Sequence, residues 1–209
     1  MKPQLLILSI CFFNLSFAQL FVDDAYIYVN DEIVFVEKDI RLDTANSMLY
    51  LRNDAQLIQG DETVENSGVG QVSVNQNGNV GVHEYNYWCS PVGNTDANNN
   101  TNRAFRPNNN IYFATAPFAT DPIASNIATF SPWGDKDGAA NLFSSLKISS
   151  RWLYSYKSGT DYSEWNHIGA TGTVDAGYGF TMKGTDVNNQ NYDFRGKPNT
   201  GTIAVDVQP

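Results

Sequence analysis

The sequence has little of three things that would point to particular classes of protein: cysteine, histidine and positive charge. It contains two Cys and two His among 209 residues, and Lys and Arg number 13 against 22 Asp and Glu, a formal net charge of −9. This acidic balance argues against nucleic acid and anionic membrane surfaces as partners, because both would repel the chain. So few His and Cys also argue against a zinc site, which needs more ligands of these types.

Long apolar runs are missing as well, and no stretch could cross a bilayer as a helix. The longest apolar run, Leu5–Phe13, follows Lys2 and precedes the small-x-small sequence Ser16-Phe17-Ala18, which is the plan of a secretory signal peptide. We therefore expect residues 1–18 to be removed on export. A lipoprotein signal is the alternative, since Leu8–Cys11 partly matches a lipobox.

Removal of residues 1–18 would leave one cysteine, Cys89, and 12 basic against 22 acidic residues, a net charge of −10. A single cysteine excludes an internal disulfide bond, so packing and hydrogen bonds must stabilise the mature chain. We expect Cys89 to be buried as a small apolar residue, with a reactive or intermolecular thiol as the alternative. Such a chain suits a protein that is secreted or held at the outer cell surface, without membrane insertion.

What the sequence does have is many short runs of β-branched and aromatic residues, separated by Asn, Asp and Gly. Between Phe21 and Val74 these runs are of strand length and follow one another too closely for helices to intervene. The pattern predicts an all-β segment over 19–80. It forms either a meander of short strands or the rungs of a β-solenoid, with Asn and Asp at the corners. The pattern leaves both alternatives open.

The most aromatic stretch is Arg151–Gly184, which holds two Trp, four Tyr and one Phe between glycines and therefore predicts β-hairpins. Two trios of alternate residues should each share one face of a sheet: Trp152, Tyr154 and Tyr156, and Tyr178, Phe180 and Met182. We expect both trios to face the core. Residues 81–209 are thus predicted to form an antiparallel β-sandwich-like region, with long exposed loops such as Asn94–Asn110.

Three segments of this second region resemble the motif set of a family of large secreted surface proteins of Bacteroidota: Tyr85–Gly93, Gly177–Gly184 and Phe194–Gly201. The resemblance implies a β-rich module and a C-terminal sorting domain that the type IX secretion system reads. This sequence carries no such domain, and its last predicted strand, Thr202–Val207, runs to the end of the chain. We therefore expect a truncated or split chain, or a product that stays in the periplasm.

A smaller feature agrees with this resemblance. Asp43-Thr44-Ala45 resembles the acceptor sequence that these bacteria O-glycosylate. The alternative is an ordinary turn between two strands.

Few residues of the sequence carry recognisable chemistry. No G-x-S-x-G nucleophile motif is present, and we expect His83 and His167, both beside aromatic strand residues, to be structural. Asp135 and Asp137 supply half of a calcium-binding loop with Gly138, although the acidic residue expected further along is absent. We name Asp135 and Asp137 as the candidate metal ligands, with a plain exposed turn as the alternative.

Carbohydrate recognition is the remaining candidate chemistry. Trp133 and Trp165 lie in polar, turn-rich surroundings and are the candidate ligand-binding residues, whereas we expect the other two Trp, Trp88 and Trp152, to be core. A glycoside hydrolase would need two carboxylates facing across a cleft. The candidates for that role are Asp161, Glu164 and Asp175, but no spacing identifies a pair.

Together these patterns predict an exported, non-enzymatic module of the cell surface or extracellular space, adhesin-like or structural in the envelope. It would need no cofactor other than calcium, and its partner would be a glycan or a cell surface. The alternative is a carbohydrate-binding module of a secreted polysaccharide-handling protein.

Overall fold

The computed structural model describes residues 19–61, 63–95, 102, 104–114, 123–132, 139–141, 145–157, 161–186 and 190–205. The signal-peptide and lipoprotein alternatives concern residues 1–18 and lie outside this description. Helical structure in the described part is confined to short turns: α1 (Pro107–Asn110), η1 (Ser150–Trp152) and η2 (Tyr162–Glu164). Strands make up most of the rest, and the all-β prediction is confirmed.

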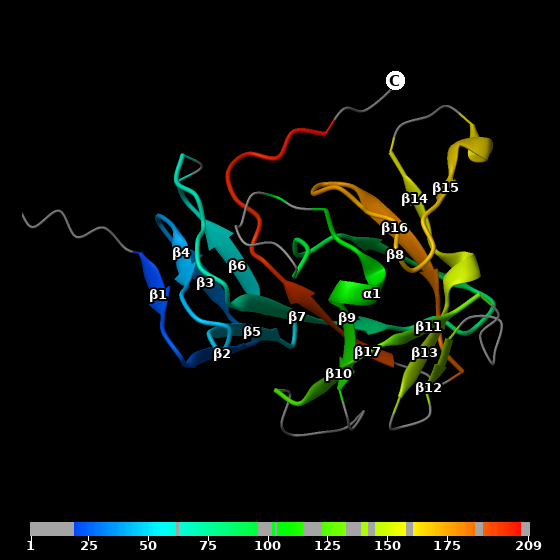
Figure 1. Ribbon diagram of the computed structural model, residues 1–209, viewed down its shortest axis with the longest axis horizontal. Helices are drawn as coiled ribbons and strands as arrows, with labels where there is room; N and C mark the ends of the chain where they lie inside the picture. The colour runs from blue at the N-terminus through cyan, green and yellow to red at the C-terminus, as the bar shows by residue number, and fades with distance from the viewer. Residues whose placement is uncertain are drawn as a thin grey trace, which may run out of the picture.

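The first strands form a β-solenoid, at the left of Figure 1. They are β1 (Leu20–Val22), β2 (Tyr26–Asn30), β3 (Ile33–Val36), β4 (Ile40–Leu42), β5 (Met48–Arg52), β6 (Gln56–Gln59) and β7 (Gln71–Gly78). Each strand of the first coil pairs in parallel with the strand three places later: β1 with β4, β2 with β5 and β3 with β6. Neighbours in a meander run antiparallel, so the meander alternative is wrong and the solenoid alternative is correct.

The local sequence explains the coil. Alternate strand residues turn inward and are buried, among them Val22, Val29, Val36, Ile40, Leu42, Leu49 and Leu51. At the corners the chain turns through residues with positive φ: Asp24 (46°), Asp31 (56°), Asn53 (50°) and Asp54 (64°). Asn and Asp tolerate this left-handed conformation better than other residues with a side chain, which is why they separate the strands.

A partial third coil joins the solenoid to the rest of the chain. Ser67 forms a parallel bridge with Arg41, and β7 pairs in parallel with β5. On its other side β7 pairs antiparallel with β17 (Gln190–Gly196), so the two predicted segments share one sheet. That six-stranded sheet has the order β10-β9-β17-β7-β5-β2, in which β9 is Ile111–Ala114 and β10 is Ser125–Ile127.

Two further sheets complete the second region. The four-stranded sheet has the order β15-β14-β16-β8, formed by β8 (Tyr85–Cys89), β14 (Tyr154–Tyr156), β15 (Asn166–His167) and β16 (Gly179–Lys183). The three-stranded sheet is β11 (Thr129–Ser131), β13 (Leu146–Ser149) and β12 (Ala139–Asn141). All pairs within the four-stranded sheet are antiparallel, as predicted. In the three-stranded sheet β12 pairs antiparallel with β13, whereas β11 pairs in parallel with it.

Aromatic rings form the core between the four-stranded and six-stranded sheets. Trp88 of β8 contacts Tyr192 and Phe194 of β17, with ring centroids 5.8 and 5.6 Å apart. Phe105 stacks on Phe180 of β16 at 5.0 Å. Edge-to-face and offset contacts at these distances add to the free energy gained from burying the rings. This core decides which face of the four-stranded sheet is left for solvent.

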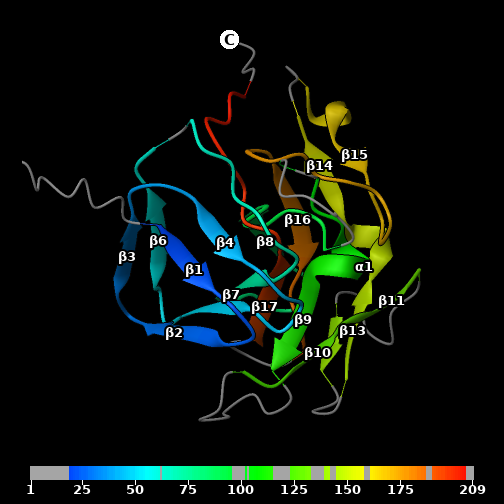
Figure 2. The ribbon, with the colours of Figure 1, turned by 60° about the vertical axis from the view of Figure 1, so that its left-hand side comes forward.

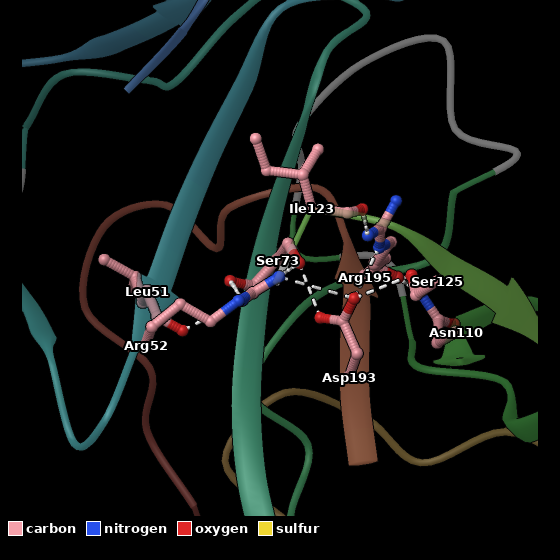
Figure 3. Close-up of polar contacts among 8 residues, drawn as sticks. All are labelled: Leu51, Arg52, Ser73, Asn110, Ile123, Ser125, Asp193 and Arg195. Atoms are coloured by element: carbon pink, nitrogen blue, oxygen red, sulfur yellow. Dashed lines mark hydrogen bonds and ion pairs between the residues drawn. The ribbon is translucent and has the colours of Figure 1, made fainter. Parts of the chain in front are cut away.

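A charged network, drawn in Figure 3, ties the solenoid to the second region. The Asp193 carboxylate of β17, only 1% exposed, accepts hydrogen bonds from Arg195 Nε (2.7 Å), Ser73 Oγ (2.5 Å) and Ser125 Oγ (2.8 Å). Nη2 of the buried Arg52, from β5, lies 3.5 Å from the same carboxylate. Burial lowers the pKa of Arg52, and Asp193 acts in the opposite direction. Four strands therefore share one buried carboxylate.

Two loop predictions need correction. Asn94–Asn110 is not a wholly exposed loop: it contains α1, and the buried Asn110 donates hydrogen bonds to the carbonyl oxygens of Gly93 (2.9 Å) and Arg195 (2.6 Å). The strand predicted at Thr202–Val207 is wrong for 202–205, which have no regular structure, and the remainder lies outside the described residues. Just before it, Thr200 hydrogen-bonds Asn66 and Asn102 instead of a neighbouring strand.

Lys197 provides a test of the junction between the regions. It is buried, and its ammonium donates to the carbonyl oxygens of Gly68 (3.3 Å) and Gly70 (3.1 Å). Burial lowers its pKa. A lysine with a lowered pKa in the folded state makes a contribution to stability that is fully present above the unfolded pKa of about 10.4 and is lost as pH falls through the folded pKa.

We therefore expect the wild-type protein to gain stability relative to Lys197→Met as pH rises toward about 10.4. Urea unfolding of both proteins at a series of alkaline pH values measures this difference. Comparing the two proteins removes the contribution of other groups, such as Tyr192, whose pKa burial raises. A difference that does not change with pH would contradict the assignment.

Candidate aromatic binding groove

Strand register decides which side chains of the four-stranded sheet point outward. Phe180 pairs with Trp88 on one side and Ser155 on the other, and these three residues face the core. The next position, Thr181, pairs with Tyr87 and Tyr154, which consequently face away from the core. The outer face of this sheet is therefore rich in aromatic residues.

These outward side chains line a groove of about 330 Å³. Its lining consists of Tyr85 and Tyr87 from β8, Thr181 from β16, Tyr154 from β14, Trp152, and Tyr162, Ser163 and Trp165 from η2 and the residue after it. Tyr87 and Tyr162 are strongly exposed, at 73% and 89%. Exposed aromatic rings held in an open groove are typical of ligand-binding surfaces.

The rings are held by contacts with one another. Trp165 lies 6.4 Å from the ring of Tyr87 and 5.2 Å from that of Tyr156, centroid to centroid, with tilted planes. The turn that precedes Trp165 is closed by a capping box. In it, the side chains of Asp161 and Glu164 each accept a hydrogen bond from the backbone N–H of the other residue. The position of Trp165 is thus set from two sides, by the sheet and by η2.

At the other end of the groove the aromatic rings contact cations. Lys183 Nζ lies 3.9 Å from the ring centroid of Trp152, and the guanidinium of Arg151 lies 5.1 Å from it. Such cation–π contacts orient the indole and occupy its surface. Tyr87, Tyr162 and Trp165 therefore form the part of the groove that offers rings to a ligand.

The structure places one of the two predicted ligand-binding residues in this groove. Trp165 lines it, whereas Trp133 lies outside the described residues. The expectation that Trp152 belongs to the core is wrong, and so is the inward orientation expected of Tyr154 and Tyr156. All three are half-buried, and Trp152 and Tyr154 line the groove. Phe180 and Met182 of the other trio are buried, as expected.

Sequence reasoning missed Tyr85, Tyr87 and Tyr162 as groove residues. Their alternation gave a usable signal for the first two, since Tyr85 and Tyr87 point away from Trp88, which packs against the core. Tyr162 carries no such alternation signal, because it lies in the turn η2 and not in a strand. Its exposure depends on how this turn packs against the sheet.

The three carboxylates considered for glycoside hydrolysis have other partners. Asp161 and Glu164 close the η2 capping box, and Asp175 forms an ion pair with Lys157 at 2.5 Å. None of the three lines the groove. This arrangement does not present the facing pair of carboxylates that the hydrolytic mechanism uses.

The other candidate residues are distributed over the surface. His167 Nε2 lies 3.0 Å from the carbonyl oxygen of Ser150, and His83 is exposed in a turn. Cys89 is exposed, so the expectation that it is buried is wrong. Thr44 Oγ1 lies 3.0 Å from Ser47 Oγ and accepts a hydrogen bond from the Asp24 N–H (3.2 Å), so the predicted glycosylation acceptor takes part in a turn.

The predicted calcium ligands Asp135 and Asp137 lie outside the described residues. In the part of the chain that is described, no three His, Cys, Asp or Glu side chains gather where they could hold a metal ion. The calcium site stays a prediction. Among the same residues, the helical turns are too short to cross a bilayer.

The fold and groove define a β-solenoid joined to sheets whose strand pairs are mostly antiparallel, one of which presents an aromatic outer face. Comparisons of the chain with protein-family models, with curated proteins and with solved structures found no match.

Proposed function

We propose that this protein is an exported, non-enzymatic surface module that binds glycan chains through the aromatic groove. The observation that carries the proposal is the outward position of Tyr87, Tyr162 and Trp165 in a groove of about 330 Å³. The apolar faces of sugar rings stack on such side chains, and the hydroxyl groups of Tyr and Ser at the rim can bond sugar hydroxyls.

The sequence supports the exported part of the proposal. The N-terminal signal-like segment directs the chain out of the cytoplasm, and the three motifs that resemble secreted surface proteins of Bacteroidota favour a place at the cell surface. An acidic chain without paired cysteines suits such a location. Adhesion to glycan-coated surfaces follows from binding in the groove.

The proposal is tested by glycan-array binding of the wild-type protein and of Trp165→Ala. We expect at least one neutral polysaccharide to be retained, and Trp165→Ala to weaken its binding at least about tenfold, because truncating a central aromatic anchor costs about 2 kcal/mol. Isothermal titration with the best glycan measures the dissociation constants.

Tyr26→Ala is the matched control, since Tyr26 is a 57% exposed aromatic residue of the solenoid and does not line the groove. It should bind like wild type. No retained glycan, or equal binding by the Trp165→Ala variant, would remove the glycan-binding function and leave a structural envelope role. Release of reducing sugar from the bound polysaccharide would contradict the non-enzymatic part.

A further inference from the structure

The first coil of the solenoid presents an open sheet edge. Among the described residues, β1, β2 and β3 each pair on one side only, with β4, β5 and β6. Figure 2 brings this end of the molecule forward, at the left. We call these three strands the open edge. Strand edges that carry unpaired N–H and C=O groups readily accept a further strand from another chain.

The side chains of the open edge are apolar on its outer surface. Five large residues are exposed there: Phe21 (54%), Tyr26 (57%), Tyr28 (41%), Ile33 (63%) and Phe35 (59%). In the next coil, by contrast, Tyr50 at the position paired with Tyr28 is only 5% exposed. Within the six-stranded sheet the second coil thus buries an aromatic residue whose first-coil partner is exposed, whereas in β6 Ile58, the partner of Phe35, is itself 44% exposed.

The contacts of existing outward aromatic residues indicate what packs beside them. Arg41 of β4 lies beside Phe21, its register partner in β1, with 5.4 Å between guanidinium and ring centroid. Tyr50 is likewise contacted by the guanidinium groups of Arg52 (5.0 Å) and Arg195 (5.6 Å). Outward aromatic rings of this solenoid thus lie beside arginine side chains, from the paired strand for Phe21 and from the same sheet for Tyr50.

The charge around the open edge is strongly negative. The turns and strand ends of the first coil carry six acidic residues: Asp23, Asp24, Asp31, Glu32, Glu37 and Asp39. The one basic residue between Gln19 and Asp39 is Lys38, which pairs with Asp61 at 3.5 Å. A second copy of this chain would bring an equally acidic edge and be repelled, whereas a basic strand would be attracted.

We propose that the open edge binds an extended segment of a partner protein in which Lys or Arg alternate with apolar residues. The segment adds to the first coil as a further strand, with its backbone paired to one of the edge strands. Its basic side chains lie beside the exposed aromatic rings of that strand, as Arg41 lies beside Phe21, and face the acidic corners. This binding surface is separate from the aromatic groove and does not depend on the groove's function.

The probe is a fluorescent synthetic peptide in which Lys and Arg alternate with Val and Thr, titrated with the purified protein. We expect a dissociation constant on the order of 1 to 100 μM, rising steeply with salt. A peptide with Glu in place of Lys and Arg should not bind. Proline in the middle of the basic peptide should abolish binding, because it removes a backbone donor and blocks the strand.

Charge-reversal variants locate the site. Asp23→Lys and Glu32→Lys, both at exposed positions of the first coil, should each weaken binding about fivefold. Glu65→Lys, an exposed acidic residue after β6, is the matched control and should change binding less than about twofold. Equal weakening by all three would indicate attraction to the net charge alone and overturn the proposal.

Three other results would also overturn it. These are no binding of the basic peptide, equal binding of the proline-containing peptide, and wild-type affinity in both first-coil variants. Light scattering after size exclusion checks the alternative occupant. A concentration-dependent dimer that dissociates in the Tyr28→Lys variant would assign the open edge to a second copy of this chain.

Discussion

Asp193→Asn is expected to lower the free energy of unfolding by about 3 to 5 kcal/mol, a large share of the 5 to 15 kcal/mol of a typical domain. The substitution keeps the shape of the side chain and removes its charge. Arg52 is 2% exposed, and its pKa is already lowered by burial, so its charge would remain in the interior without the carboxylate that opposes this shift. Removing one partner of a buried charged network is costly for this reason.

Urea unfolding followed by tryptophan fluorescence measures this change. The control is Asp43→Asn, because Asp43 also pairs with an arginine, Arg41, at 2.6 Å, but its side chain is 33% exposed and solvent screens the pair. We expect the control to cost no more than about 1 kcal/mol. Equal losses in the two variants would show that the network of Asp193 contributes no more than a surface ion pair.

A second variant keeps the test valid if Asp193→Asn does not fold. Adding Arg52→Met removes the buried positive charge that faces Asp193 from β5 and replaces its stem with an apolar side chain. The double variant is expected to recover part of the lost stability, since interacting charges do not contribute additively. Arg52→Met alone gives the reference. If adding it to Asp193→Asn lowers the free energy of unfolding by as much as it does in the wild-type protein, the two residues contribute independently and this account is contradicted.

Gly68→Ala is expected to prevent formation of the third coil and to cost at least about 3 kcal/mol. Gly68 has a φ of +92°, and a Cβ atom added there would lie 1.9 Å from the carbonyl oxygen of Leu42. That oxygen accepts the Gly70 N–H hydrogen bond at 2.9 Å. Relief of the overlap would therefore break the contact between the second and third coils.

Gly81→Ala is the matched control, because no atom lies within 4 Å of a Cβ atom placed there. We expect it to change the free energy of unfolding by no more than about 0.5 kcal/mol. Thermal and urea unfolding of the two variants are compared with wild type. If Gly68→Ala does not fold while Gly81→Ala folds normally, the prediction is confirmed. Equal unfolding midpoints for the two variants would contradict the prediction.

The solenoid illustrates how far the sequence could predict the fold. Short apolar strands and the Asp and Asn residues between them predicted both the strands and the corners, because local conformational preferences decide these features. Whether β2 pairs with β3 or with β5 could not be predicted. Both arrangements need strands of the same length. The choice between them depends on pairing between strands that are far apart in the sequence, which the local pattern does not show.

In the groove, too, the local pattern could be predicted from the sequence and the tertiary arrangement could not. Alternation predicted that Trp152, Tyr154 and Tyr156 share a face, and the same spacing puts Tyr85 and Tyr87 on one face. It could not predict which face meets the core. The interior is instead filled by Phe180 and Met182 from the opposite face, where the ring of Phe180 contacts Phe194 of β17.

By itself the sequence determined an all-β chain, its Asn and Asp corners, and the pairs of aromatic residues that share a face. These features follow from the conformational preferences of neighbouring residues along the chain. Only the tertiary structure decided that the first strands stack as parallel coils, that Trp165 joins Tyr87 in an outward groove, and that Asp193 is buried between two arginines. Each of these depends on contacts between segments far apart in the sequence, and the free energy of such contacts is set by the packing of whole sheets.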